Sequence, residues 1–182
     1  MKFSMLLCLS LVCAAASVTP AWAQEEAKQA QTITLGDGAL EMTVPEGWKA
    51  VRPRVGIIEH EMSIPAKEGD DSPGRLTIMG AGGSIEANID RWRGQFSKLE
   101  SDEVKKEKIA GQEVHFIEFS GDFRDQAGPF APAVEKKGYT VLAAIIVTEK
   151  RGNYFLKFYG PKGTIEENKK KFEKMVQDMK AK

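Results

Sequence analysis

The hydrophobic pattern begins with a run unlike the rest of the chain. Phe3 to Val18 contains no charged residue and is rich in Leu, Ala and Val. Pro20 follows and ends any helix, and Ala21 and Ala23 form the small-x-small pattern that signal peptidases require. The run of sixteen residues is shorter than the ~20 that a helix needs to span a bilayer. We therefore predict a cleavable export signal at residues 1–23.

Two alternatives to a cleaved signal are a retained N-terminal anchor and a lipid anchor on a cysteine. Cys8 and Cys13 follow Leu7 and Val12, and these bulky residues fit a lipidation site poorly. Both cysteines lie in the predicted signal, so the mature chain contains none. This excludes disulfides, cysteine nucleophiles and thiolate metal sites from the mature protein.

The pattern after the signal begins with a tail and a hairpin. Residues 24–31 are polar and without periodicity, which predicts a flexible tail. Thr32–Leu35 and Ala39–Val44 are strand candidates on either side of a Gly-Asp-Gly turn, and Asp-Gly between such runs favours a hairpin. The alternative is that the first run only leads into the fold. Trp48 follows a Pro-Glu-Gly turn, and we expect it to anchor the core.

The middle of the chain predicts two strands and a helix. Gly56–Ile64 and Leu76–Met79 have strand character. Ser84 is a good N-cap, and it precedes apolar residues spaced by four, three and four positions, which is typical of an amphipathic helix. This core-facing stripe is Ile85, Ile89, Trp92 and Phe96.

The second half predicts a meander and a closing helix. Strand candidates are Val104–Ala110, Val114–Phe123, Tyr139–Thr148 and Tyr154–Tyr159, with a polar loop at Arg124–Lys137. Val141–Val147 is continuously apolar, which indicates a central strand covered on both faces. Thr164 and Glu167 have the spacing of a capping box, and the apolar face of the helix they would start is Ile165, Phe172, Met175, Val176 and Met179. We predict one α+β domain at residues 32–182.

Charge limits the possible partners. Lys2 is the only charged residue of the predicted signal, so the mature chain keeps 25 basic against 26 acidic residues. Nucleic acid and anionic membranes require concentrated basic charge. We therefore expect no nucleic-acid partner, and no stable membrane span after cleavage.

Two segments resemble the PsbP-like family, which is named for an extrinsic photosystem II protein. They are Leu40–Trp48, with its Val-Pro-Glu-Gly-Trp turn, and Ile109–Val114. The hairpin around Gly152 and the closing helix add the same order of elements, so the resemblance covers roughly Thr32 to Met179. It implies an antiparallel sheet flanked by helices on both faces, an α-β-α sandwich. It also implies a non-catalytic binding or assembly role.

Two motifs invite a ligand or a metal. Gly80-Ala81-Gly82-Gly83-Ser84 precedes a helix, but it lacks the Lys of a P-loop, and a tight turn with a Ser cap is the simpler interpretation. In Glu59-His60-Glu61 the two carboxylates share one face of a strand and His60 takes the other. His60 would meet His115 only if their strands were neighbours, and the alternative is two ordinary sheet histidines. We predict no metal site and no cofactor.

The candidate catalytic residues do not form a recognised catalytic motif. Ser63, Ser84 and Ser120 lie outside any Gly-x-Ser-x-Gly elbow. Asp70 and Asp71 lie in a predicted turn and are interpreted as solvated. We therefore predict that the chain is not an enzyme, with a hydrolase of non-standard site as the remaining alternative.

The segment Asp122–Tyr139 is the candidate interaction surface. Long connections between strands are often functional, and this one mixes apolar and basic side chains. The candidate surface residues are Phe123, Arg124, Phe130, Val134, Lys136 and Lys137. The alternative is a loop that folds back over the sheet and buries Phe130.

Together these patterns predict an exported protein, periplasmic or secreted, that acts through protein-protein contacts without catalysis. The alternative function is a small-molecule or lipid carrier with a pocket between sheet and helix. The partner, protein or small molecule, is not identified by the sequence. We expect the mature chain to be a monomer.

Overall fold

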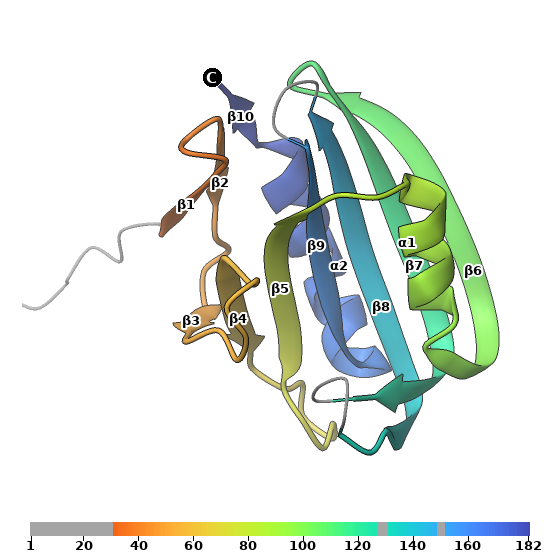
Figure 1. Ribbon diagram of the computed structural model, residues 1–182. Helices are drawn as coiled ribbons and strands as arrows, with labels where there is room; N and C mark the ends of the chain where they lie inside the picture. The colour runs from red at the N-terminus through yellow and green to blue at the C-terminus, as the bar shows by residue number, and fades with distance from the viewer. Residues whose placement is uncertain (1–30, 127–130, 149–151) are drawn as a thin grey trace, which may run out of the picture.

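The structure is a computed structural model that describes residues 31–126, 131–148 and 152–182 (Figure 1). The predicted export signal and nearly all of the predicted tail lie outside these ranges. The strands are β1 (Thr32–Leu35), β2 (Leu40–Thr43), β3 (Lys49–Val51), β4 (His60–Ile64), β5 (Gly74–Ala81), β6 (Phe96–Ile109), β7 (Gln112–Asp125), β8 (Val134–Thr148), β9 (Gly152–Pro161) and β10 (Lys180–Ala181). The helices are α1 (Ile85–Arg93) and α2 (Lys162–Gln177).

The strands form two antiparallel sheets. The small sheet has the order β1-β2-β10, and the large one has the order β3-β4-β5-β9-β8-β7-β6. Figure 1 shows the small sheet beside one edge of the large one, with α1 and α2 drawn on opposite sides of the large sheet. The predicted α+β class with antiparallel sheets is confirmed.

The predicted N-terminal hairpin is present. β1 pairs with β2, and its register places Ile33 opposite Met42 and Leu35 opposite Leu40, with all four side chains buried. The C-terminal strand β10 pairs with the other edge of β2. The sequence did not predict β10, because two exposed residues carry no hydrophobic alternation.

Strand β8 has the doubly covered character that its apolar run predicts. Side chains from Val141 to Ile146 are all buried. Alternate residues enter two separate core clusters, Val141 with α1 residues such as Trp92, and Leu142 with α2 residues such as Phe172. Neighbouring side chains of a strand point to opposite faces, so a run without polar positions requires cover on both.

The two helices begin differently from one another. Ser84 caps α1 as predicted, and its hydroxyl oxygen accepts a hydrogen bond from the Ala87 amide at 3.1 Å. The helix ends at Arg93, so Phe96 is buried as the first residue of β6 and not on the helix. The predicted capping box of α2 is wrong, because α2 starts after Pro161, which makes no side-chain capping bond.

The predicted loop at 124–137 is shorter than expected. β7 continues to Asp125 and β8 begins at Val134, so their hairpin reaches beyond the apolar part of either strand. The register of the β6–β7 pair shifts next to Gly121. Only glycine fits at this position, because a Cβ on residue 121 would lie 2.0 Å from the Lys98 carbonyl oxygen. β6 itself was predicted only in part, since this edge strand is charged and almost entirely exposed.

Within the described ranges, no helix has the length and apolar character needed to cross a membrane.

Candidate functional site

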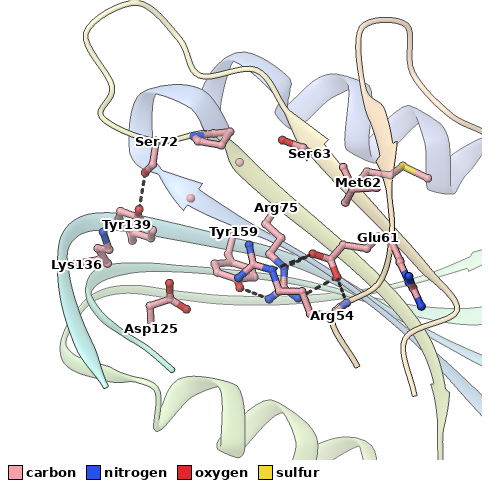
Figure 2. A pocket seen from close by; sticks show the side chains of 15 residues that line it. Arg54, Glu61, Met62, Ser63, Ser72, Arg75, Asp125, Lys136, Tyr139 and Tyr159 are labelled. Atoms are coloured by element: carbon pink, nitrogen blue, oxygen red, sulfur yellow. Dashed lines mark hydrogen bonds and ion pairs between the residues drawn. The ribbon is translucent and has the colours of Figure 1, made fainter. Parts of the chain in front are cut away.

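The main hollow of interest is a cleft between the β3–β4 segment (residues 49–64) and the β7–β8 hairpin end. Its volume is about 390 Å³. β5 and β9 lie between these two walls in the sheet order and contribute Arg75 and Tyr159 (Figure 2). The polar lining residues are Arg52, Arg54, Glu61, Ser63, Ser72, Arg75, Asp125, Lys136, Tyr139 and Tyr159.

Glu61 is the most deeply buried carboxylate of the cleft, with a side chain only 2% exposed. Arg75 donates to both of its oxygens, from Nε at 2.8 Å and from Nη2 at 3.1 Å. The Arg54 amide donates to Oε2 at 3.1 Å, and the Arg54 Nε lies 3.5 Å from Oε1. This bidentate pair holds β4 and β5 together across the cleft wall, and Figure 2 shows both arginines gathered around the carboxylate.

The pKa values of the network follow from these bonds. Burial by itself raises the pKa of Glu61, but the hydrogen bonds from Arg75 and Arg54 outweigh it and leave the pKa below the ordinary value. Burial likewise opposes the charge of Arg75, and its bonds to Glu61 and Tyr159 raise its pKa instead. The pair is therefore ionised at neutral pH.

The phenol of Tyr159 extends the network. Arg75 Nη1 donates to the Tyr159 oxygen at 2.6 Å, and the guanidinium carbon lies 5.8 Å from the ring centroid. Burial is the largest cause of a raised Tyr159 pKa, so the phenol stays neutral at physiological pH. Because its oxygen accepts from Arg75, its own O–H remains a donor.

The opposite wall comes from the hairpin. The Tyr139 hydroxyl lies 2.8 Å from the Ser72 hydroxyl, and the Tyr139 ring stacks on Phe123 with centroids 6.1 Å apart. Lys136 and Asp125 also line this wall. Four basic residues therefore face two acidic ones around the cleft, a local excess of two positive charges in a chain whose total charge is near zero.

Lys157 lies next to the cleft on β9 and is half-buried. Its ammonium nitrogen is 4.9 Å from the Tyr159 ring centroid and 5.0 Å from that of Phe123, and it donates to Gln95. Burial, followed by the positive charge of Arg91, lowers its pKa to about 7. The sequence provided no signal for this, because a lysine inside an apolar strand is usually assigned to the solvent side.

The predicted surface residues have different environments. Phe123 is wrong as a surface residue: it is 2% exposed and packs against Phe96, Tyr139 and Tyr159. Its strand continues the apolar alternation of β7 toward the core, so the ring faces inward. Phe130 lies outside the described residues.

The other four predicted surface residues lie at the hairpin end. Arg124 is exposed and donates to the Gly94 carbonyl at 3.0 Å, at the C-terminal end of α1. Val134 and Lys137 are exposed, and Lys136 lines the cleft. The hairpin therefore contributes both an apolar and a basic side chain beside the cleft.

Exposed apolar side chains lie on the two segments that form the cleft walls. Val51 lines it, and Val55 and Ile57 follow within three residues of the lining Arg54. Across the cleft, Val134 pairs with the lining Asp125. Their exposed fractions are 40% for Val51, 44% for Val55, 71% for Ile57 and 55% for Val134. We call these four side chains the apolar rim.

The histidines do not form a site together. His60 is on β4 and His115 is on β7, and three strands separate them in the sheet. His60 Nε2 lies 3.1 Å from the Thr34 carbonyl oxygen, and His115 Nε2 lies 2.8 Å from a Glu113 carboxylate oxygen. Across the part of the chain that the structure describes, no group of three His, Cys, Asp or Glu residues is placed to hold a metal ion.

The candidate serines are also separate. Ser63 lines the cleft, but neither histidine does. Ser84 caps α1, and Ser120 lies 2.7 Å from Ser101 across the β6–β7 pair. Sequence reasoning predicted none of the Glu61–Arg75–Tyr159 network. The one sequence feature that pointed toward this network was the placement of Glu59 and Glu61 on one strand face. It identifies an ion pair only when the cation on the neighbouring strand is also known.

The hollow between the large sheet and α2 is small. Its volume is about 40 Å³, with Phe116, Leu142 and Phe172 among its lining residues. Ligand pockets occupy roughly 300–1,000 Å³. This hollow is therefore too small for the lipid or small molecule of the carrier hypothesis.

Comparison with known proteins supports the fold. No family model and no curated protein sequence matches the chain. The solution structure of cyanobacterial PsbP (CyanoP) from Synechocystis sp. PCC 6803 matches with a TM-score of 0.53 and 12% identity, over 94% of this chain and 99% of that one. The Ran-binding protein Mog1p of Saccharomyces cerevisiae matches with a TM-score of 0.50 and 10% identity, over 84% and 95%. The chain therefore has a PsbP-like fold, as its sequence resemblance predicted.

Proposed function

We propose that this chain is an exported, non-catalytic binding or accessory protein that acts by contact with another protein. In this proposal residues 1–23 are removed as a signal peptide and residues 24–31 form a tail. Residues 32–182 act as a single PsbP-like sandwich with one helix on each face of the large sheet. The mature protein works as a monomer in the periplasm or as a secreted protein.

The observation that supports a protein contact most directly is the apolar rim on both sides of a basic cleft. Large apolar side chains with exposed fractions of 40–71% cost free energy in water and are favourable when a partner covers them. Arginine is enriched at protein interfaces, and Arg52, Arg54 and Arg75 line the cleft beside the rim.

The carrier alternative has less support. A carrier needs an enclosed apolar volume, and the hollow between the sheet and α2 holds only about 40 Å³. The larger cleft of about 390 Å³ has a charged lining, which disfavours a lipid. Mog1p, a Ran-binding protein by name, is consistent with protein contact on this type of fold, although fold likeness alone does not assign a partner.

The test is affinity capture from the exported fraction of the native host with three purified variants. Ile57→Asp and Val134→Asp each place a charge on the apolar rim, and we expect each to reduce the captured partner about fivefold or more. Val104→Asp is the matched control, because Val104 is 44% exposed on β6, away from the cleft lining. All three variants should have a free energy of unfolding within ~0.5 kcal/mol of the parent protein's.

Two results would contradict the proposed contact surface. If Val104→Asp reduces capture as much as the rim variants do, the rim has no special role. If the rim variants capture the parent's full amount, the proposed contact surface is wrong.

A further inference from the structure

We propose that the basic cleft is a carboxylate-binding site, and that its occupant is an acidic side chain from a segment of the partner protein. This inference rests on the proposed function, because it names the chemistry of the partner at the same surface.

The charge balance favours an anion. Arg52, Arg54, Arg75 and Lys136 face the cleft, against Glu61 and Asp125. Glu61 accepts both bonds of Arg75 and the Arg54 main-chain amide, and the Arg54 Nε lies 3.5 Å from it, so two guanidinium groups share this one carboxylate. With Asp125 also counted, an excess of two positive charges remains, with Arg52 and Arg54 on one wall and Lys136 on the other.

Arg54 is the side chain best placed to meet an incoming anion. Its side chain is 63% exposed, and its Nε lies 3.5 Å from Glu61, outside the range of a strong hydrogen bond. The guanidinium has five N–H donors in a fork that matches a carboxylate. Arg75 adds a second guanidinium on the same carboxylate, and its bonds to Glu61 and Tyr159 fix its position.

A neutral donor, the Tyr159 hydroxyl, completes the site. The Tyr159 oxygen accepts from Arg75 at 2.6 Å, so its O–H is directed elsewhere. The Ser72 hydroxyl donates to Asp71 at 2.9 Å. The Tyr139 hydroxyl, 2.8 Å away on the opposite side of the cleft, therefore donates to the Ser72 oxygen, and neither proton is free for a ligand (Figure 2). A carboxylate has about four lone-pair positions, and the Tyr159 hydroxyl together with the Arg54 guanidinium bonds to some of them in a partly desolvated site.

The size and borders favour a protein segment over a free ion. A volume of about 390 Å³ is far larger than one carboxylate needs, and it accommodates an acidic side chain with its flanking backbone. The apolar rim at 51–57 and at Val134 then contacts apolar residues on either side of the acidic one. The expected partner segment alternates acidic and apolar residues.

The experiment measures fluorescence anisotropy of a labelled, capped peptide of alternating Glu and Val, with a Gln-Val peptide as the matched control. The parent protein should bind the Glu peptide about tenfold or more tightly than the Gln peptide. Arg54→Glu and Lys136→Glu should each weaken Glu-peptide binding about tenfold, whereas Arg54→Lys, which keeps the charge but loses the fork, should weaken it less than Arg54→Glu does. Lys171→Glu, on the exposed side of α2, should change binding less than about twofold.

Two further measurements separate the possible failures. Equal binding of the Glu and Gln peptides, or an equal loss with Lys171→Glu, overturns the carboxylate site. If the rim variants still lose the captured partner in that case, the proposed protein contact stands without it. Free succinate that displaces the Glu peptide at concentrations matching the peptide's own dissociation constant would assign the site to a small dianion and would also overturn the proposal.

Discussion

At the residue scale, Lys157 has the environment most unlike its sequence context. It occupies a strand whose neighbours Leu156 and Phe158 are fully buried, and its ammonium sits against the rings of Phe123 and Tyr159. Contact with aromatic faces favours the cation, but burial and the charge of Arg91 oppose it more strongly. The residue therefore stabilises the fold less when it is protonated.

Lys157→Met should stabilise the protein and flatten its pH dependence. The folded pKa of about 7 lies below the unfolded value of 10.5, so between these values the unfolded state binds more protons and stability rises with pH. Below about pH 7 both states are protonated and the penalty is complete. At pH 7 we expect Lys157→Met to add about 1–4 kcal/mol to the free energy of unfolding.

The measurement is urea denaturation at several pH values from 6 to 10, with Lys170→Met on exposed α2 as the control. In the control, the free energy of unfolding should change with pH as steeply as in the parent protein. If it also changes as steeply in Lys157→Met, the amine of Lys157 titrates normally in the fold.

At the element scale, the start of α2 depends on a distant loop. Asp70 Oδ2 accepts hydrogen bonds from both the amide and the hydroxyl of Thr164, each at 2.6 Å. The Thr164 hydroxyl oxygen in turn accepts from the Lys67 amide at 3.0 Å. The carboxylate thus satisfies an unpaired amide and interacts favourably with the helix dipole, the role that the sequence assigned to Thr164 itself.

Asp70→Ala should therefore destabilise the protein by about 1–2 kcal/mol, since an amide in the buried first turn of α2 loses its acceptor. Asp71→Ala is the control: Asp71 is exposed and bonds only to the adjacent Ser72 among the described contacts, so its loss should cost less than ~0.5 kcal/mol. Chemical denaturation gives both values. Equal effects at the two positions would contradict the long-range cap.

At the scale of the whole molecule, the large sheet divides the core in two. Trp48 belongs to the cluster with α2 and the small sheet, where its indole donates to Asn168 at 3.0 Å. Trp92 belongs to the cluster with α1, where it meets Phe155 edge-on at 5.9 Å between centroids. Both residues are core anchors, as the sequence predicted, but they stabilise opposite faces.

Trp48→Ala and Trp92→Ala should each cost ~3–5 kcal/mol. Because the clusters are separate, the milder pair Trp48→Phe and Trp92→Phe should be additive within ~0.5 kcal/mol in the double variant. Thermal and urea unfolding of the two single variants and the double variant provide the cycle. A larger coupling would mean that the sheet transmits packing changes from one face to the other.

Much of the fold was predictable, because local patterns specify it. Apolar runs and turn glycines identified the β1–β2 and β8–β9 hairpins, and helical spacing after Ser84 identified α1. β6 was largely missed because it is an edge strand, held by backbone pairing with β7 and almost without buried side chains. The hairpin end at Val134 was assigned to a loop for the same reason.

Much less of the candidate site was predictable. Lys136 and Val134 were proposed as surface residues from the mixed character of their segment; Lys136 lines the cleft, and Val134 pairs with the lining Asp125. Phe123 was misassigned, since a loop was expected where β7 continues. Glu61 and Arg75 were not linked, because their contact depends on the β4–β5 register, which pairs Glu61 with Thr77 and brings Arg75 to the diagonal position.

By itself the sequence determined where most strands and helices lie and which of their faces are apolar. These properties follow from residue spacing and turn chemistry within a few positions of each other. Only the tertiary structure decided that Arg54, Glu61, Arg75 and Lys136 share one cleft, and that Asp70 caps α2. Those contacts join residues up to 94 positions apart, and strand order and register, which no local pattern encodes, bring them together.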